Sequence, residues 1–381
     1  MANLKINPSR LKGEVKIPPS KSMAHRAIIC AALSDGLCII ENIDYSDDII
    51  ATIDAMKSLG ATIVRYKDHL EVIGVYGVPK KAKDFRIIDC NESGSTLRFL
   101  VPISLLFSGR SKFIGKGNLG KRPLTTYYNI FDNQGIEYSC EEGNLNLIIN
   151  GKLKPGNFEV EGNVSSQFIT GLLFTLPLLN SDSKITITTK MESKGYIDLT
   201  LKAMSDFGIE VINNDYREFV IKGNQRYNAR NYRVEGDYSQ AAFFYVANIL
   251  GNDIRINNLM ENSLQGDKKI VEITRNLCYN KNNEPNGFSI NAADIPDLVP
   301  ILGVLGTFCQ GKSLIYGAER LKIKESDRLE STSAALNALG GNITAENDGL
   351  SVLHSVLKGG VVDSFGDHRI AMSAAIAATV C

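Results

Sequence analysis

The sequence predicts an α/β protein built from one repeated unit. Six times, a strand-like stretch leads through a polar loop into an apolar helix that is rich in small residues. A repeat of nearly constant length indicates an array of one supersecondary unit. The predicted helix starts are Lys21, Gly94, Ser166, Ser239, Pro296 and His368, which are 73, 72, 73, 57 and 72 residues apart.

A glycine that closes a second helix recurs behind each of four of these starts. In IDAMKSLGATI and three similar segments, Gly60, Gly135, Gly208 and Gly340 stand between a helical pattern and a strand-like stretch. Glycine favours the left-handed backbone that ends a helix. Each unit is therefore predicted to be βαβαββ. The fourth unit lacks this glycine and contains the polar run NKNNEPNG, so we expect it to be irregular.

Grouping the units three and three predicts two similar domains. The first is expected to span residues 20–230, and the second to combine residues 1–19 with 231–381. Pro18-Pro19 and the polar stretch GNQRYNARNYR mark the two crossings, so the N-terminal strand is expected to belong to the second domain. The predicted helix start of the sixth unit, His368, lies 13 residues before Cys381, so we expect this unit to be truncated.

The composition of the chain argues against several classes of protein. Lys plus Arg and Asp plus Glu both number 42, and this balance argues against nucleic acid or a membrane surface as a partner. The seven cysteines form no CxxC pair and no metal-binding spacing, which is typical of reduced thiols in a cytoplasmic protein. The N-terminal segment has no apolar signal-peptide core. We therefore expect a cytoplasmic protein that holds no metal.

Charged side chains at the helix starts point to anion binding. A helix N-terminus offers unpaired N–H groups and a partial positive charge, which suit phosphate or carboxylate. Ser and Asp at these positions are equally explained as helix caps. Capping does not explain Lys21 and Arg26 in the first helix, or Arg369 in the sixth, because cations there oppose the helix dipole unless an anion offsets them.

Two further loops add cations. In KGNLGKRP, Arg122 follows Lys121 in a glycine-rich loop that is able to close over a ligand. In RLKIKESDRLE, Lys324 and Arg328 are four residues apart and share a face if the segment is helical. A solvated salt-bridge face is the alternative interpretation of that second segment.

The sequence resembles the enolpyruvyl transferases. The matching pieces are PPSKSMAHRA, NESGSTLR, GKRP, VSSQF, SKGYID, EGDYSQAAFF, IPDLVP, KIKESDR and GDHRIAM, which appear in family order over nearly the whole chain. The resemblance implies the family fold, an inside-out α/β barrel type with two domains of three repeated units that close on the substrates. That fold agrees with the repeats found from spacing.

Within the family, the motifs are most similar to those of the enzymes that use shikimate 3-phosphate. The resemblance then implies transfer of the enolpyruvyl group of phosphoenolpyruvate to the 5-hydroxyl of shikimate 3-phosphate, with release of phosphate. No cofactor is implied, glyphosate is an expected inhibitor, and a monomer is expected. Two alternatives stay open: the sister enzyme that uses UDP-N-acetylglucosamine, and a truncated, inactive binding domain.

The resemblance also assigns roles to individual residues. The catalytic residues implied are Asp297 as the base for the attacking hydroxyl, Glu325 at the methylene carbon, and Lys21 as a proton partner. The implied contacts to shikimate 3-phosphate are Lys21, Ser22, Arg26, Ser165, Ser166, Gln167, Ser193, Tyr196, Asp297 and Lys324. Those implied for phosphoenolpyruvate are Lys21, Gly94, Arg122, Gln167, Arg328 and Arg369.

Overall fold

The computed structural model describes residues 3–76, 84–141 and 143–381, which fall into two compact units. We call Pro19–Glu235 the N-unit, and Met1–Pro18 together with Gly236–Cys381 the C-unit. The expected domain boundaries, after residues 19 and 230, lie one and five residues from these edges. Each unit has its own hydrophobic core.

The described strands of the N-unit form three four-stranded sheets of one pattern. In each sheet a parallel pair is extended by two antiparallel strands. In order across each sheet, the strands are β13 (Tyr232–Arg233), β2 (Leu37–Glu41), β4 (His69–Ile73) and β3 (Thr62–Arg65); β5 (Phe85–Asp89), β6 (Arg110–Ile114), β8 (Asn146–Asn150) and β7 (Glu137–Ser139); and β9 (Asn157–Val160), β10 (Ser183–Ile187), β12 (Glu218–Ile221) and β11 (Val211–Asn214).

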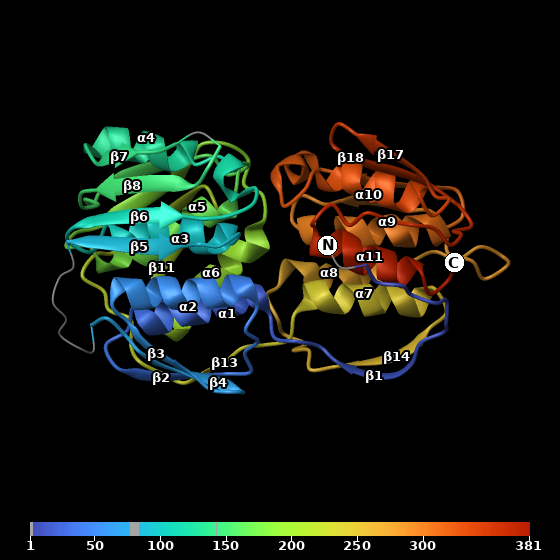
Figure 1. The fold of residues 1–381 in the computed structure, drawn as a ribbon, viewed down its shortest axis with the longest axis horizontal. Coiled ribbons are helices and arrows are strands. Elements are labelled where there is room, and N and C mark those ends of the chain that lie inside the picture. Colours follow the sequence, from blue (N-terminus) through green and yellow to red (C-terminus); the bar gives the residue numbers. More distant parts are fainter. Residues whose placement is uncertain (1–2, 77–83, 142) are drawn as a thin grey trace. The chain divides into compact units, whose positions relative to one another are not determined.

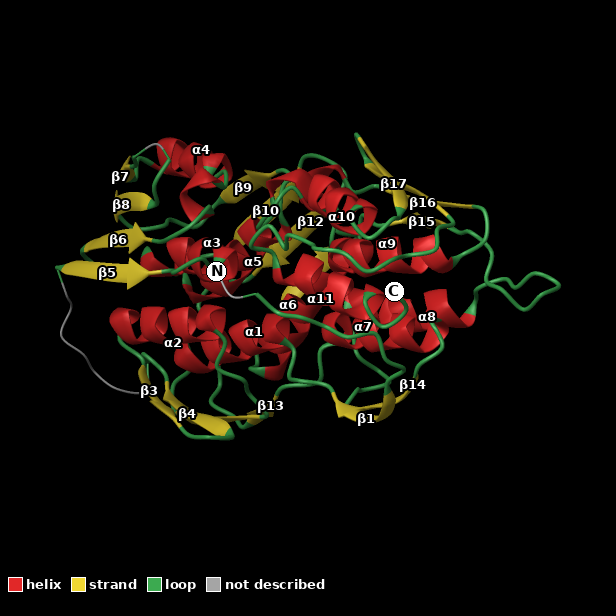
Figure 2. Cartoon of the chain, turned by 45° about the vertical axis from the view of Figure 1, so that its right-hand side comes forward, coloured by secondary structure: helices red, strands yellow, loops and turns green. Residues whose placement is uncertain are grey.

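The helices of the N-unit lie inside these sheets, as Figures 1 and 2 show. They are α1 (Lys21–Ala32), α2 (Asp47–Leu59), α3 (Gly94–Ser104), η1 (Leu119–Lys121), α4 (Thr125–Gln134), α5 (Ser166–Thr175), η2 (Leu176–Leu178) and α6 (Lys194–Asp206). Helix α2 packs against both α1 and α3, and α6 packs against both α5 and α1. Helices α3 and α5 are apolar on nearly all sides because they are buried along almost their whole length.

The C-unit contains one four-stranded sheet of the same pattern and one strand pair among its described residues. The sheet consists of β15 (Ser289–Asn291), β16 (Lys312–Tyr316), β18 (Gly349–Leu353) and β17 (Asn342–Glu346), and the pair of β1 (Lys12–Lys16) and β14 (Asp253–Asn257). The helices are α7 (Tyr238–Ile249), η3 (Gly266–Lys268), α8 (Lys269–Arg275), η4 (Pro296–Leu298), α9 (Val299–Phe308), η5 (Glu319–Ile323), α10 (Arg328–Asn337) and α11 (His368–Ala377). The fully buried α9 packs against α7, α10 and α11.

The chain exchanges one strand at each crossing between the units. Strand β1 precedes α1 in the sequence but pairs in parallel with β14 of the C-unit. Strand β13 precedes α7 but pairs in parallel with β2 of the N-unit. This second exchange explains why the N-unit extends to Glu235, five residues beyond the expected boundary: the ladder holds Tyr232 against Ile40.

The helix starts fall close to the predicted residues. Helices α1, α3, α5 and α11 begin at the predicted positions, α7 begins one residue early at Tyr238, and Pro296 begins η4, which runs into α9. The expected closing glycines Gly60, Gly135, Gly208 and Gly340 all have positive φ, between 65° and 117°. These glycines therefore end helices as predicted.

Two units depart from the predicted βαβαββ pattern. In the fourth, β13 pairs with the N-unit, β14 is the one described ladder strand that follows α7, and α8 is short, so the expected irregularity is present. In the sixth, the strand-like stretch before His368 is not a strand, and residues 354–367 are irregular. A strand exists only with a hydrogen-bonded partner, and no described strand pairs with this stretch.

Candidate active site

The start of α1 carries a cation that is already paired. Ser20 caps the helix by accepting a hydrogen bond from the Met23 amide. The Lys21 ammonium, on the first helical residue, lies 2.7 Å from the Asp48 carboxylate of α2. Because both side chains are partly exposed, this cation is offset by Asp48 and still reachable by an anionic ligand.

Arg26 lies one turn deeper and is almost fully buried. Its guanidinium donates to the Thr200 hydroxyl at 2.9 Å and to the backbone oxygens of Ser22 and Tyr196 at 2.7 and 2.8 Å. Burial lowers its pKa to about 10, which leaves it charged at neutral pH. Arg26 thus ties α1 to α6, and its contacts bring together three residues predicted to bind shikimate 3-phosphate.

The start of α3 is tightly packed against another predicted cation. A Cβ atom added to Gly94 would lie 2.7 Å from Nη1 of Arg122 and 3.7 Å from Oε1 of Gln167. The structure therefore places three predicted phosphoenolpyruvate contacts beside one another. Only glycine lets the Arg122 guanidinium approach the backbone this closely.

Gln167 is oriented by both ends of its amide. Its Oε1 accepts from Arg98 at 2.8 Å, and its Nε2 donates to the Ser95 hydroxyl at 3.0 Å. The Arg98 guanidinium also lies 5.0 Å from the centre of the Phe168 ring. These contacts fix the first turn of α5 against the first turn of α3.

The predicted serine contacts lie at the starts of α5 and α6. Ser165 caps α5 by accepting from the Gln167 amide at 3.3 Å, and Ser166 is the first residue of that helix. Ser193 stands before α6 with a φ of +56°, in the left-handed region that non-glycine residues seldom adopt. Strain of this kind costs about 1–3 kcal/mol and is common at functional sites.

In the C-unit, the predicted catalytic carboxylates gather around a buried arginine. The Arg328 guanidinium donates to Asp297 at 2.7 Å, to Glu325 at 2.6 Å and to Asp367 at 2.8 Å. Burial acts to lower the pKa of Arg328, but the three carboxylates outweigh burial and raise it. Arg328 is therefore a permanent cation whose position is set by three anions.

A second arginine contacts the same carboxylate. Arg369 donates to the Asp297 carboxylate at 3.1 Å and to its backbone oxygen at 3.3 Å. Asp367 accepts from the Arg369 amide at 2.9 Å and so caps α11, while its other oxygen holds Arg328. One buried carboxylate therefore bonds to the Arg328 side chain and the Arg369 backbone, two of the three arginines predicted to bind phosphoenolpyruvate.

Lys324 lies beside this group, which we call the Arg328 cluster (Asp297, Glu325, Arg328, Asp367 and Arg369). Burial lowers the pKa of Lys324 to about 8, against the opposing effect of the Asp297 and Glu325 carboxylates. A substantial fraction of Lys324 is thus neutral just above neutral pH, so its charge depends on which anions are near.

Several residues in these contacts were not predicted. Asp48, Ser95 and Arg98 hold predicted residues in place, but in the sequence they belong to ordinary helical patterns. Asp367 stands beside His368 and Arg369 in GDHR, where helix capping and a role in an anion site explained it equally well. Its bond to Arg328, 39 residues earlier, depends on the tertiary fold.

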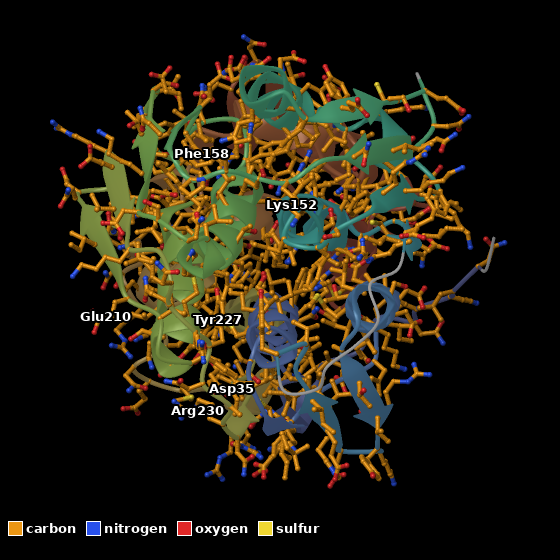
Figure 3. The ribbon with its side chains drawn as sticks, turned by 90° about the vertical axis from the view of Figure 1, so that its left-hand side faces the viewer. Asp35, Lys152, Phe158, Glu210, Tyr227 and Arg230 are labelled. Atoms are coloured by element: carbon orange, nitrogen blue, oxygen red, sulfur yellow. The ribbon has the colours of Figure 1, made fainter. Side chains whose placement is uncertain are left out.

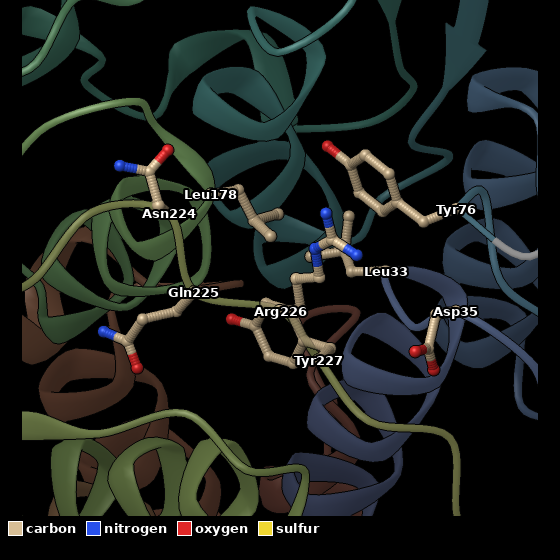
Figure 4. Close-up of a pocket in the computed structure, with 8 residues that line it drawn as sticks. All are labelled: Leu33, Asp35, Tyr76, Leu178, Asn224, Gln225, Arg226 and Tyr227. Atoms are coloured by element: carbon tan, nitrogen blue, oxygen red, sulfur yellow. The ribbon is translucent and has the colours of Figure 1, made fainter.

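Other features of the described residues lie apart from these clusters. Residues 3–76, 84–141 and 143–381 contain no His, Cys, Asp and Glu group suited to a metal ion, and no helix with the length and apolar character needed to cross a membrane. A pocket of about 410 Å³ in the N-unit (Figure 4) is lined by Leu33, Asp35, Tyr76, Leu178, Asn224, Gln225, Arg226 and Tyr227. None of these is a predicted site residue.

Figure 3 shows the side of the N-unit that carries part of this pocket. Asp35 and Tyr227 both line it, and Asp35 accepts a hydrogen bond from the Ala229 amide at 3.1 Å. The Tyr227 hydroxyl donates to the Phe174 backbone oxygen at 3.0 Å. These two hydrogen bonds hold the loop at 227–229 against the turn that follows α1 and against α5.

The repeated α/β fold, with Arg and Lys beside carboxylates at its helix starts, agrees with the resemblance to the enolpyruvyl transferases. The family model of EPSP synthase (3-phosphoshikimate 1-carboxyvinyltransferase) matches residues 6–381. The chain belongs to the EPSP synthase family. The resemblance read from the motifs and the prediction of a transferase enzyme are thereby confirmed.

Individual relatives agree with this assignment. The 3-phosphoshikimate 1-carboxyvinyltransferase of Clostridium beijerinckii is 57% identical over all of this chain and 92% of the relative. That of Clostridioides difficile is 56% identical, with the same shares covered. An EPSP synthase structure from Acinetobacter baumannii matches 98% of this chain and 90% of its own with a TM-score of 0.77 at 23% identity, which confirms the predicted fold.

Proposed function

We propose that this protein transfers the enolpyruvyl group of phosphoenolpyruvate to the 5-hydroxyl of shikimate 3-phosphate and releases phosphate. Full-length relatives named for this activity support the reaction. The Arg328 cluster is the structural observation that carries it, because two arginines and Lys324 surround the carboxylates that the chemistry requires. The UDP-N-acetylglucosamine reaction and an inactive binding domain are not favoured by these relatives.

Two proton transfers define the roles of the carboxylates. The 5-hydroxyl loses its proton as its oxygen bonds to C2 of phosphoenolpyruvate, and the C3 methylene gains a proton that it loses again when phosphate departs. We assign Asp297 to the hydroxyl, and Glu325 with Lys21 to C3. Because Arg328 and Arg369 both donate to Asp297, its carboxylate is held in a fixed position, and we infer that positioning supplies much of the rate.

The cations serve the anionic groups of the substrates. Arg122, Arg328 and Arg369, with Gly94, Gln167 and Lys21, are assigned to phosphoenolpyruvate. Charge that develops on the departing phosphate is stabilised by groups already held in place. The remaining contacts assigned to shikimate 3-phosphate are Ser22, Arg26, Ser165, Ser166, Ser193, Tyr196 and Lys324.

Phosphate release provides the test of this function. The purified chain is incubated with phosphoenolpyruvate and either shikimate 3-phosphate or UDP-N-acetylglucosamine, and inorganic phosphate is measured. We expect release only with shikimate 3-phosphate. Release only with UDP-N-acetylglucosamine would assign the sister reaction, and no release from folded protein would assign a binding function.

We further propose that the protein acts as a cytoplasmic monomer and that glyphosate inhibits it in competition with phosphoenolpyruvate. Gly94 supports the inhibitor proposal, because an added methyl group would lie 2.7 Å from Arg122. We expect Gly94→Ala to reduce inhibition by glyphosate and to raise KM for phosphoenolpyruvate, both through displacement of Arg122. Steady-state kinetics with glyphosate, and light scattering for the monomer, check these expectations.

A further inference from the structure

A buried chain of side-chain hydrogen bonds joins three helices of the N-unit. His25 Nδ1 of α1 lies 2.8 Å from the Thr52 hydroxyl of α2, and that hydroxyl lies 2.7 Å from the Thr96 hydroxyl of α3. The Thr96 hydroxyl in turn donates to the Ser93 hydroxyl at 2.8 Å. We call His25, Thr52, Thr96 and Ser93 the hydroxyl relay. All four are at most 1% exposed.

The positions of these residues along their helices are informative. His25 is four residues after Lys21 in α1, and Thr52 is four residues after Asp48 in α2, so each lies one turn below a member of the Lys21–Asp48 pair on the same helix face. Thr96 is two residues after Gly94 in α3. The relay thus lies beneath the starts of α1 and α3, which carry proposed substrate contacts, and beneath the start of α2, which carries Asp48.

The relay has one favoured donor order. Burial lowers the pKa of His25 to about 3, so the ring is neutral and has one N–H group. Its Nε2 has no hydrogen-bond partner among the described residues. A buried N–H without a partner is rarer in proteins than an unsatisfied acceptor, which places the proton on Nδ1. His25 then donates to Thr52, Thr52 to Thr96, and Thr96 to Ser93.

The far end of the relay caps α3. The Ser93 oxygen accepts from the Thr96 amide at 3.1 Å as well as from the Thr96 hydroxyl. Ser93 immediately precedes Gly94, whose backbone is packed against Arg122. The Thr96 hydroxyl also lies 3.4 Å from the Asp48 backbone oxygen. A shift of α3 against α2 would therefore move the Gly94 start relative to the Lys21–Asp48 pair.

We propose that the hydroxyl relay is a positioning device that fixes the Gly94 helix start relative to the Lys21–Asp48 pair, and that Thr52 and Thr96 are positioning residues for phosphoenolpyruvate. This inference rests on the proposed function, because both helix starts are assigned there to phosphoenolpyruvate. Buried hydroxyls suit this task, since a hydrogen bond has a defined length and direction whereas apolar packing tolerates sliding.

Replacing Thr52 by valine tests the relay. Valine has the shape of threonine but removes the hydroxyl, so both the His25 and Thr96 contacts are lost. We expect Thr52→Val to raise KM for phosphoenolpyruvate at least about tenfold, with a smaller fall in kcat, because the binding contacts are displaced whereas only Lys21 of the proposed acid–base groups lies near the relay. Thr52→Ser keeps the hydroxyl and should restore KM to within about threefold of the wild-type value.

Thr175→Val is the matched control. Thr175 is fully buried at the end of α5, and its hydroxyl donates to the Gly171 backbone oxygen at 2.8 Å, outside the relay. This variant should lose stability without a change in KM, which separates positioning from general destabilisation. An equal rise of KM in both variants, or an unchanged KM in folded Thr52→Val, would overturn the relay.

Two further outcomes are decisive. If Thr52→Val does not fold, Ser93→Ala ends the relay with a smaller change, and an unchanged KM for phosphoenolpyruvate in that variant overturns the proposal. If the wild-type protein releases no phosphate at all, the proposed function fails and the role of the relay fails with it. If the wild type is active and Thr52→Val has an unchanged KM for phosphoenolpyruvate, the proposed function stands and only the positioning role of the relay is overturned.

Discussion

Arg328 illustrates how one side chain depends on contacts that a sequence motif does not contain. Its spacing from Lys324 and Glu325 is visible in KIKESDR, but its partners Asp297 and Asp367 come from segments more than 30 residues away in opposite directions. The motif therefore assigned Lys324, Glu325 and Arg328 to the candidate site. It did not predict that the guanidinium is fully enclosed by carboxylates, because that arrangement requires η4, α10 and α11 to pack together.

Asp297→Asn separates binding from chemistry. The amide retains an oxygen that accepts from Arg328 or Arg369, so binding of shikimate 3-phosphate should remain within about threefold of wild type. An amide does not accept the hydroxyl proton, and kcat should fall by about 10²- to 10⁴-fold. Phosphate-release kinetics and calorimetric titration measure the two effects. Asp294→Asn, at an exposed position three residues earlier, is the control. Equal loss of binding and turnover would indicate a structural role for Asp297.

At the scale of elements, the helix starts and the closing glycines were predictable because both depend on local chemistry. A cap residue, a glycine with positive φ and an apolar period act within a few residues of one another. The hydroxyl relay was not predictable, since Thr52 and Thr96 look like ordinary helical threonines in the sequence. One of the two strand exchanges was predictable. Pro18-Pro19 indicated that β1 belongs to the C-unit, but nothing in the residues 232–233 of β13 indicated that this strand pairs with β2.

Two glycine-to-alanine changes should differ in cost for separate reasons. Gly135 closes α4 at φ +65°, and a Cβ there meets nothing within 4 Å, so Gly135→Ala should cost only backbone strain of about 1 kcal/mol. Gly171 lies in α5, where a Cβ would be 2.4 Å from the Arg98 backbone oxygen, so Gly171→Ala should cost ~3 kcal/mol by forcing α3 and α5 apart. Urea unfolding measures both, and equal costs would contradict this account.

At the scale of the whole molecule, each unit contains a buried titratable group. The two groups make the stability of their units change with pH in opposite directions. In the C-unit, burial raises the pKa of Asp267 to about 7, aided by the Asp297 charge and opposed by Arg369 and by the hydrogen bond from Ser239. In the N-unit, burial lowers the pKa of His25 to about 3. Both shifts mean that the charged form is disfavoured in the folded state.

The sign of each effect follows from linkage. Asp267 keeps its proton in the folded state up to about pH 7, whereas the unfolded carboxyl loses it near pH 4, so the stability of the C-unit falls as pH rises between these values. His25 remains neutral in the folded state down to about pH 3, whereas the unfolded imidazole binds a proton near pH 6.5, so the stability of the N-unit falls as pH drops through that range.

Asp267→Asn should therefore stabilise the C-unit at pH 8 by about 1–3 kcal/mol and have little effect at pH 4. The asparagine still accepts a hydrogen bond from Ser239 but has no charge to bury. Scanning calorimetry at pH 4, 6 and 8 measures the change, and Asp253→Asn, which replaces an exposed carboxylate of the same unit, is the control. A stabilisation that is independent of pH would show that Asp267 is not the group responsible.

The pairing of β1 with β14 has a consequence for synthesis of the chain. Lys12 pairs with Asp253, 241 residues later, so β1 leaves the ribosome long before its partner exists. At roughly 5–20 residues per second, the interval is about 10–50 seconds. During this time the N-unit can assemble its helices, but its first sheet stays incomplete until residues 232–233 emerge to supply β13. The exchanged strands thus set an order of completion: the N-unit sheet closes when β13 emerges, and β1 finds β14 only after the whole N-unit has been translated.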